Sequence, residues 1–222
     1  MSVYYAPFDY VNPAAKLIVV GVTPGRTQMI AALLETQRQL ERGASPDEAC
    51  FAAKQTASFA GMRDNLVAML DYFGIHNSLG INSCNLLFAE NYQLLHSTSV
   101  LRYPVFLDTS NYNGTPKVRK NSFLKRYVED YFAKEAKLLR EATFVPLGAA
   151  ASEVLEWLGA DGVIEADRIL SGFPHPSGAN NERISYLLEK KPGSSLSAKT
   201  SAAKLDAARL SIRAKIAALG SL

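Results

Sequence analysis

The chain has 222 residues, 48% of them hydrophobic and 20% charged, so it can bury a core, and we expect one domain spanning residues 1–222. Its two cysteines, Cys50 and Cys84, are too few for a zinc ribbon, a four-cysteine iron–sulfur cluster or a disulfide scaffold. The sequence shows no secretion signal and no apolar stretch that could cross a membrane, which predicts a cytoplasmic protein without membrane contact.

Basic charge is concentrated in two segments, although the formal net charge is only +3. Residues 117–126 hold five Lys or Arg and no acid, and the stretch from residue 190 to the end holds seven against one acid. We expect the second segment, about 191–222, to be helical. Two interpretations stay open for both segments, namely contact with a polyanion and ordinary solvated helix faces.

Apolar runs that alternate with helical patterns predict the fold. In chain order, strands are expected at 15–22, 79–88, 142–148 and 168–173. Helices are expected at 27–42, from the Ser45-Pro46 capping signal to 57, at 61–73, 118–140 and 149–158, and twice more after the last strand, ending with 198–219. Residues 96–116 are predicted to be irregular. Such alternation indicates an α/β fold, a three-layer αβα sandwich with a central, mostly parallel sheet of about four strands.

Two loops that follow predicted strands have unusual sequences. The first loop, "GVTPGRTQ" at 21–28, allows close approach of a ligand to the backbone but matches neither common nucleotide-binding pattern. It is one residue short of a P-loop and has Arg26 where that motif has lysine, and it lacks the dinucleotide fingerprint. The second loop, "FPHPSGANNER" at 173–183, places His175 and free backbone N–H groups at the carboxyl end of a strand, where open α/β sheets bind ligands.

Taken together, the two loops resemble the signature pair of the uracil-DNA glycosylase superfamily. That pair is a Gly-x-x-Pro-Gly turn after the first strand and a His-Pro-Ser-x-x-Asn loop after the last. The segment "INSCNLLF" at 81–88 is similar to the Asn-x-Cys-Pro-Leu stretch of the single-strand-selective monofunctional branch, with Asn85 in place of proline. The resemblance spans roughly residues 15–190, and its specific motifs cover about 25 residues.

The resemblance implies an enzyme that flips a base out of DNA and breaks its N-glycosidic bond. His175 would then be catalytic, because a donor beside the departing base stabilises the negative charge that develops there. The groups implied to hold the DNA backbone are Pro24, Gly25 and Arg26 of the first loop and Pro176, Ser177, Gly178, Asn180 and Arg183 of the second. Asn180 is also expected to cap the following helix.

Two further residues are expected to contact the flipped base. Asn82 aligns with the family's asparagine, and its carboxamide can pair with a uracil edge or, flipped, with a cytosine-like edge. Phe59, in "ASFAG" before a helix, is the candidate for stacking on the base, with Tyr112 as a rival.

The first loop departs from the family at Thr23, where relatives usually carry Asn or Asp. A threonine hydroxyl can hold a catalytic water but is a poor base, so slow hydrolysis, a relocated carboxylate and binding without cleavage all stay open. Asp64 and Asp108 are the candidates for a relocated carboxylate.

We therefore expect a monofunctional DNA glycosylase that removes a uracil-like or modified pyrimidine, in repair or in defence against modified foreign DNA. It should need no cofactor and no metal, and its partner should be DNA, single- or double-stranded, bound by a monomer. Two alternatives stay open: a DNA or altered-base binding protein without catalysis, and a nucleoside or nucleotide hydrolase.

Overall fold

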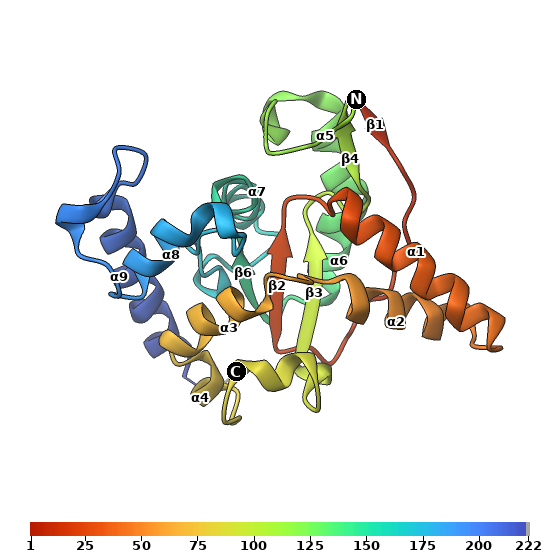
Figure 1. Ribbon diagram of the computed structural model, residues 1–222, viewed down its shortest axis with the longest axis horizontal. Helices are drawn as coiled ribbons and strands as arrows, with labels where there is room; N and C mark the ends of the chain where they lie inside the picture. Colours follow the sequence, from red (N-terminus) through yellow and green to blue (C-terminus); the bar gives the residue numbers. More distant parts are fainter. Residues whose placement is uncertain (221–222) are drawn as a thin grey trace.

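A parallel sheet of three strands lies at the centre of the computed structural model, which describes residues 1–220 (Figure 1). Its strand order is β3-β2-β6, formed by Leu95–Ser99, Leu17–Gly21 and Thr143–Pro146. In register, Leu17 lies opposite both Leu95 and Thr143. A second, antiparallel sheet joins β1 (Ser2–Val3), β4 (Val105–Leu107) and β5 (Ser110–Asn111) in the order β1-β4-β5.

Helices connect and cover the strands. The α-helices are α1 (Arg26–Glu41), α2 (Pro46–Ala57), α3 (Arg63–Tyr72), α4 (Ile75–Ser78), α5 (Ser122–Tyr127), α6 (Ala133–Leu138), α7 (Ala149–Ala160), α8 (Asn181–Leu187) and α9 (Ala202–Leu219). A π-helical turn at Val128–Phe132 joins α5 to α6 into one nearly continuous helix over 122–138, shorter than the helix predicted at 118–140. Val118–Lys120 form a separate 3₁₀ turn. No helix among the described residues is long and apolar enough to cross a membrane.

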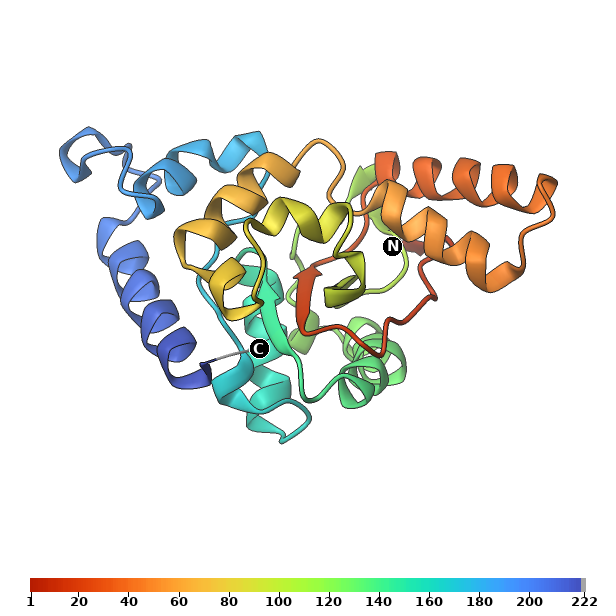
Figure 2. The same cartoon turned by 90° about the horizontal axis from the view of Figure 1, so that it is seen from below.

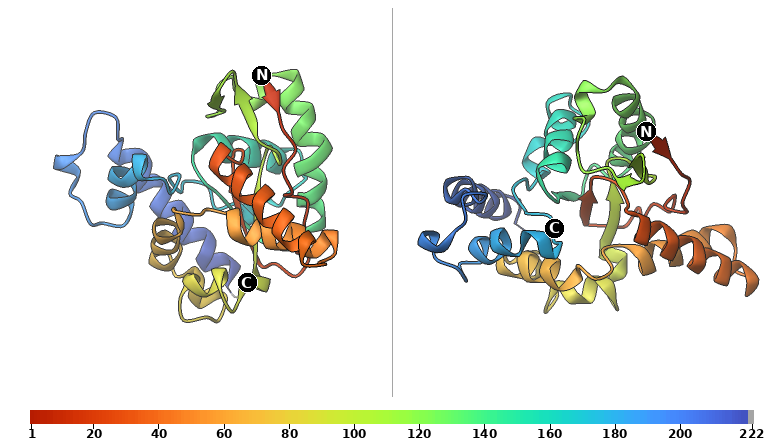
Figure 3. Two further views of the ribbon diagram at one scale, coloured as in Figure 1. Left: turned by 45° about the vertical axis from the view of Figure 1, so that its right-hand side comes forward. Right: turned by 45° about the horizontal axis from the view of Figure 1, so that its top comes forward.

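The central strand β2 separates two hydrophobic cores because its side chains alternate between its faces. Ile18 and Val20 pack with residues of α5, α6 and α7, whereas Leu17 and Val19 pack with residues of α3, α8 and α9. Figure 3 shows these helix groups on opposite sides of the sheet. All five residues of β2 are buried, which explains its uniformly apolar sequence with the β-branched residues Ile18, Val19 and Val20. The fold is therefore mixed α/β with helices on both faces of a parallel sheet.

The expectation of about four strands in the central sheet is not confirmed. The segment predicted as the fourth strand runs parallel to β6, but it makes only two isolated bridges, Phe144 with Ile169 and Leu147 with Phe173. Because both bridges are parallel, the segment nevertheless runs in the same direction as β6. The second loop therefore leaves the sheet at the same edge as the loops after β2 and β6.

The strand predicted at 79–88 is wrong. This segment contains a turn and the 3₁₀ helix Cys84–Phe88, because Asp71 accepts hydrogen bonds from the Cys84 N–H and the Ser83 hydroxyl, both at 2.7 Å. The neighbour of β2 is instead β3, in a region predicted to be irregular. Its polar sequence "LHSTS" does not match the apolar pattern of a buried strand. The strand can be buried because His96 forms a hydrogen bond with Glu135.

The helices α1 and α2 form an antiparallel pair on one side of the molecule, and α8 and α9 lie on the opposite side (Figure 2). The predicted capping signal before α2 is confirmed: Ser45 Oγ accepts the Glu48 N–H, and Glu48 accepts the Ser45 N–H at 2.8 Å. Small residues, Ala32, Ala53 and Ala57, pack in the core shared by this pair and the N-terminal segment.

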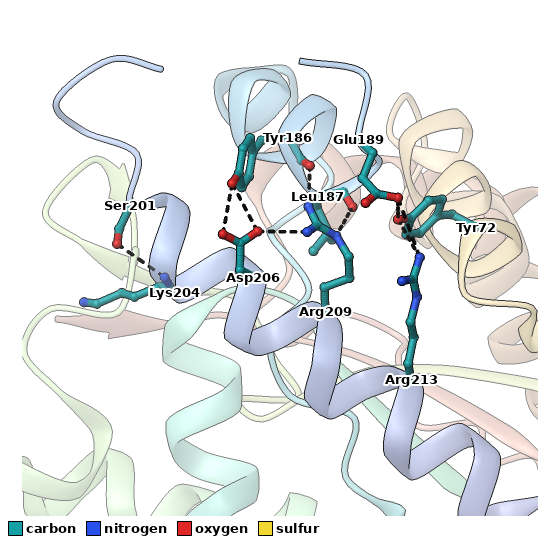
Figure 4. Close-up of polar contacts among 9 residues, drawn as sticks. All are labelled: Tyr72, Tyr186, Leu187, Glu189, Ser201, Lys204, Asp206, Arg209 and Arg213. Atoms are coloured by element: carbon teal, nitrogen blue, oxygen red, sulfur yellow. Dashed lines mark hydrogen bonds and ion pairs between the residues drawn. The ribbon is translucent and has the colours of Figure 1, made fainter. Parts of the chain in front are cut away.

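Basic residues of α9 attach this helix to the rest of the domain (Figure 4). Arg209 donates to the Tyr186 and Leu187 carbonyls at the end of α8 and to Asp206, and Arg213 donates to the Tyr72 hydroxyl at 2.8 Å. Lys215 donates to the Ala166 and Ile169 carbonyls. Much of the positive charge in the 191–222 segment, whose last two residues lie outside the described residues, therefore has a structural role.

Close packing of α9 against Gly172 gives a stability test. Gly172 has φ +117°, and a Cβ there would lie 2.6 Å from Ala208 Cβ. Gly162 has φ +73° with no neighbour within 4 Å, so it controls for backbone strain alone. We expect Gly172→Ala to lower the free energy of unfolding by about 1–3 kcal/mol more than Gly162→Ala, measured by urea denaturation. Equal losses would contradict the packing of α9 described here.

Candidate functional site

The two loops singled out in the sequence meet at the carboxyl edge of the central sheet. Gly148, which follows β6, lies between them and donates its N–H to the Phe173 carbonyl at 2.9 Å. Gly148 has φ +82°, and a Cβ at this position would lie 3.4 Å from His175 Cβ. The positive φ therefore favours glycine at this position, and the second loop packs directly against it.

Beneath this edge lies a small space, here called the inner cavity, with a volume of about 40 Å³. It has room for one to about three water molecules. Its walls come from the first loop, the residues after α2, the end of β3 and the second loop. The lining residues are Phe8, Gly21, Val22, Thr23, Pro24, Gln28, Lys54, Ser58, Phe59, Met62, Ser97, Thr98, Ser99, Arg102 and His175.

The inner cavity adjoins a much larger groove of about 1460 Å³. Five residues line both spaces, and this shared boundary is here called the mouth; they are Val22, Thr23, Gln28, Met62 and His175. The groove runs between the first loop, α7 and α9, and basic residues on its walls include Arg183, Lys199 and Lys204. Unlike Arg209, Arg213 and Lys215, the Lys204 side chain makes no hydrogen bond to a described residue, and its backbone N–H donates to Ser201 Oγ (Figure 4).

His175 is half-buried at the mouth, and its hydrogen bonding fixes its tautomer. Nδ1 accepts the backbone N–H of Ser177 at 3.3 Å, so in the neutral ring the proton is on Nε2. Burial lowers the pKa of His175 below its ordinary value, which favours the neutral ring at pH 7. His175 therefore offers a neutral N–H donor at the mouth.

The rest of the second loop is held by a chain of side-chain hydrogen bonds. Asn180 Nδ2 donates to Ser177 Oγ at 3.1 Å, and Arg183 donates to Asn180 Oδ1 at 2.6 Å and to the Lys199 carbonyl at 3.0 Å. Asn180 occupies the N-cap position of α8, but its side chain makes no capping hydrogen bond. The expected capping role of Asn180 is therefore wrong, because its amide connects Ser177 to Arg183 instead.

Asn65, which the sequence analysis did not single out, supports this loop from α3. Its Nδ2 donates to the Pro176 carbonyl at 2.9 Å and to Asn181 Oδ1 at 3.0 Å. No sequence pattern marks Asn65, because its partners lie more than a hundred residues away. Gly178 is exposed between these fixed points.

In the first loop, hydrogen bonds within the chain occupy most polar groups. Thr23 Oγ1 donates to the Tyr103 carbonyl and accepts the Val105 N–H, both at 3.1 Å. Because the hydroxyl proton is donated to Tyr103, Thr23 can only accept a hydrogen bond from a water. Thr23 connects the first loop to the segment before β4.

Gly25 and Arg26 are similarly engaged. The Gly25 N–H donates to Gln28 Oε1 and the Arg26 N–H donates to Asn111 Oδ1. The Arg26 guanidinium binds the Thr109 carbonyl at 3.0 Å and lies 5.0 Å from the Phe106 ring centroid. Pro24 is buried beside them in the cavity wall. A phosphate at this loop would have to displace these contacts to reach the Gly25 and Arg26 backbone N–H groups, whereas the exposed Arg26 guanidinium keeps further N–H donors.

Phe59 lies in the wall of the inner cavity, with 5% of its surface exposed. Its φ of +53° is rare for a bulky residue, and backbone strain of this kind is concentrated at functional sites. Its rival Tyr112 lines the groove instead, and its hydroxyl donates to the Pro116 carbonyl at 2.5 Å. Both aromatic candidates therefore line a space with His175, Phe59 in the inner cavity and Tyr112 in the groove.

Other predicted residues lie elsewhere. Asn82 is exposed and lines neither space, since its segment is not a strand that ends at the site edge. Asp64, in the first turn of α3, and Asp108, in the turn between β4 and β5, also line neither space. Thr23, Pro24, Phe59 and His175 lie together in the wall of the inner cavity. Asn82, Asp64 and Asp108 do not line it.

A buried charged cluster that was not expected from the sequence lies behind the inner cavity. Glu135 on α6 accepts hydrogen bonds from His96 Nε2 at 2.8 Å and from Arg102 at 2.5 Å. Arg102 also lies 3.7 Å from Asp9, and Lys54 on α2 donates to the Tyr10 carbonyl at 2.5 Å. The sequence feature that could have indicated this cluster is a single lysine, Lys54, on the alanine-rich, buried face of α2.

The charges of this cluster shift one another's pKa values. Burial alone would raise the pKa of Glu135, but Lys54, His96 and Arg102 outweigh it and lower that pKa far below its usual range. Burial, with a contribution from Lys54, lowers the pKa of His96 to about 4. Burial also lowers the pKa of Lys54 to about 8, with Arg102 acting in the same direction and Glu135 and Asp9 opposing.

Among the described residues, no group of three or more His, Cys, Asp or Glu side chains is arranged to hold a metal ion. No protein-family model matches the sequence, and no solved structure is significantly similar to it. The sequence is 36% identical over 195 residues to a Bacillus subtilis (strain 168) protein named Uncharacterized protein YoxB. The alignment covers 86% of this chain and 76% of YoxB.

The charged cluster predicts loss of stability in acid. An unfolded histidine binds a proton near pH 6.5, whereas folded His96 stays neutral down to about pH 4. As the pH falls through this window the unfolded state gains a proton that the folded state does not, so the free energy of unfolding should decrease. The total decrease from His96 is about 3 kcal/mol.

Urea denaturation at several pH values measures this decrease. His96→Gln should flatten the slope between pH 6.5 and 4, and His76→Gln, a histidine outside the cluster, should leave it largely unchanged. An equal slope in the wild type and in His96→Gln would show that His96 does not carry the effect.

Proposed function

The chain belongs to the same protein family as YoxB, and we propose that it is a monofunctional DNA glycosylase. It would excise a uracil-like or modified pyrimidine by hydrolysis of the N-glycosidic bond and leave an abasic site. The observation that carries the proposal is the neutral N–H donor of His175 at a mouth shared by the inner cavity and a long groove.

Chemistry at the mouth supports this activity. When the bond between the deoxyribose and the base breaks, the base departs with the electron pair and negative charge develops on its oxygens. A fixed donor at that position stabilises the transition state more than the ground state. A neutral imidazole donates without needing acid, and the hydrogen bond from Ser177 to Nδ1 holds the ring in the required tautomer.

The groove supports a polymeric substrate. Its volume of about 1460 Å³ exceeds the usual range of small-molecule pockets. Arg183, Lys199 and Lys204 provide positive charge along it, against the two acids Glu153 and Glu156. In the proposed complex the DNA strand occupies the groove and the extruded base occupies the mouth. Phe59 and Met62 form the adjacent wall.

A panel of oligonucleotides, single- and double-stranded and each carrying one modified pyrimidine, tests the proposal directly. Alkali treatment after incubation converts abasic sites into strand breaks, which a gel resolves. We expect breaks with at least one uracil-like or modified base. Gel shifts without breaks for every base would contradict the enzymatic proposal.

Binding without catalysis is the second candidate, because no Asp or Glu is among the described residues that line the inner cavity. The Thr23 hydroxyl, moreover, already makes two hydrogen bonds. A nucleoside or nucleotide hydrolase remains an alternative that failure to bind DNA at low salt would favour.

Substitution of His175 should separate chemistry from binding. We expect His175→Ala to lower the single-turnover excision rate by at least about tenfold, with DNA affinity nearly unchanged, because the donor acts mainly in the transition state. His76→Ala serves as the control, since His76 lies outside both spaces. Wild-type rates in His175→Ala would remove this residue from the mechanism.

Neutralising the groove should change the salt dependence of DNA binding. We expect Lys199→Gln with Lys204→Gln to weaken binding and to reduce the slope of log K against log salt by up to about 2, since each phosphate contact contributes about 0.9. Fluorescence anisotropy over a salt series measures this slope. Lys137→Gln on α6, outside the groove, is the control; an unchanged slope in the double variant would place the DNA elsewhere.

A further inference from the structure

The inner cavity leaves one side chain able to take a proton from water. Three ionisable side chains line it, Lys54, Arg102 and His175, and no carboxylate does so among the described residues. Arginine stays protonated, and Nδ1 of His175 already accepts the Ser177 N–H. The lone pair of a neutral Lys54 amine is therefore the available acceptor.

Lys54 reaches the cavity from the inner face of α2. It is 4% exposed, and Nζ makes one hydrogen bond to a described residue, to the Tyr10 carbonyl at 2.5 Å. No carboxylate oxygen of a described residue lies within 4.0 Å of Lys54 Nζ, the limiting distance for an ion pair. A buried ammonium needs acceptors for three N–H groups, so this environment leaves Nζ underbonded on the cavity side.

Water fits the remaining space. The cavity volume of about 40 Å³ holds one to about three waters, and a buried water needs two to four polar partners. Ser97, Thr98 and Ser99, at the end of β3, also line the cavity. With Lys54 they supply those partners.

We propose that Lys54 is the general base that takes a proton from the attacking water held in the inner cavity. The inference rests on the proposed glycosylase function and supplies the group that Thr23 does not provide. The water oxygen forms a bond to the anomeric carbon of deoxyribose as the bond from that carbon to the base nitrogen breaks. The base leaves with the electron pair, and its oxygen accepts a hydrogen bond from His175 Nε2–H.

The proton balance closes without another reactant. The water proton moves to the Lys54 amine, which becomes an ammonium, and it is then released to the departing base anion or to solvent. The products are the neutral free base and the abasic sugar. One water is consumed, and no oxidant or reductant is required.

The surroundings of Lys54 favour an amine that gains and loses a proton near neutral pH. Burial lowers its pKa to about 8, within the range to which enzymes tune catalytic lysines. Facing it are Glu135 and Asp9, which favour the charged form, and Arg102, which disfavours it. Neutral His96 and the Cys50 thiol are the other titratable neighbours.

The test compares Lys54→Arg and Lys54→Met with the wild type in single-turnover excision of the base that the wild type removes best. Arginine keeps the positive charge near Glu135 but cannot act as a base. We expect both variants to lose at least about a hundredfold in rate, with DNA affinity unchanged. Lys137→Arg and Lys137→Met, at a lysine outside the cavity, should keep wild-type rates.

The pH profile provides the second measurement. A general base must be deprotonated, so the wild-type rate should rise about tenfold per pH unit below the pKa and level off above about pH 8. The small activity left in Lys54→Arg should not show this rise. If Lys54→Met does not fold, as judged by circular dichroism and thermal unfolding, Lys54→Arg decides the outcome.

Several results would overturn the inference. Full activity in Lys54→Arg, or a rate that falls above pH 8, would show that Lys54 acts through its positive charge or not at all. A borohydride-stable link between Lys54 and the DNA would show attack by the amine itself rather than by water. These results leave the glycosylase proposal standing, whereas absence of excision by the wild type on every oligonucleotide overturns that proposal and this inference with it.

Discussion

The parallel pairing of β2 with β3 and β6 is the constraint on which the rest of the structure depends. Because these strands run in one direction, the chain leaves each of them at the same edge of the sheet. The segment at 169–173 extends the arrangement by two bridges, which is enough to bring His175 to that edge. The alternating side chains of β2 also divide the core in two, so both faces must be covered by helices.

Within this frame, the site is organised by hydrogen bonds that fix side chains before any ligand arrives. The Ser177 N–H sets the tautomer of His175, and Asn65 holds the same loop from α3. Thr23 connects the opposite loop to the segment before β4. Side chains held in this way need little reorganisation during a reaction, which is the condition for electrostatic catalysis.

The charge beneath the site is unusual in its distribution. Lys54 and Arg102 line the inner cavity, while their counter-charges, Glu135 and Asp9, lie behind it and not in its wall. This separation keeps the net charge of the cluster close to zero, while the groups that face the cavity are cationic or neutral donors. It is costly to bury such groups singly, which explains why His96 and Glu135 are hydrogen-bonded so closely.

The sequence by itself determined most helices, two of the three central strands and the loops carrying Thr23 and His175. These features follow from local patterns: β-branched apolar runs, a capping box before α2, and turn residues at strand ends. Only the tertiary structure decided that β3 lies at Leu95–Ser99, since its polar sequence becomes a buried strand through the contact between His96 and Glu135. The predicted position of Asn82 at the site was also wrong because of a tertiary contact, since Asp71 holds the segment of Asn82 in a turn. Lys54 reaches the cavity through packing of α2 on the domain, and no periodicity in a single sequence specifies which distant segment a helix face will meet.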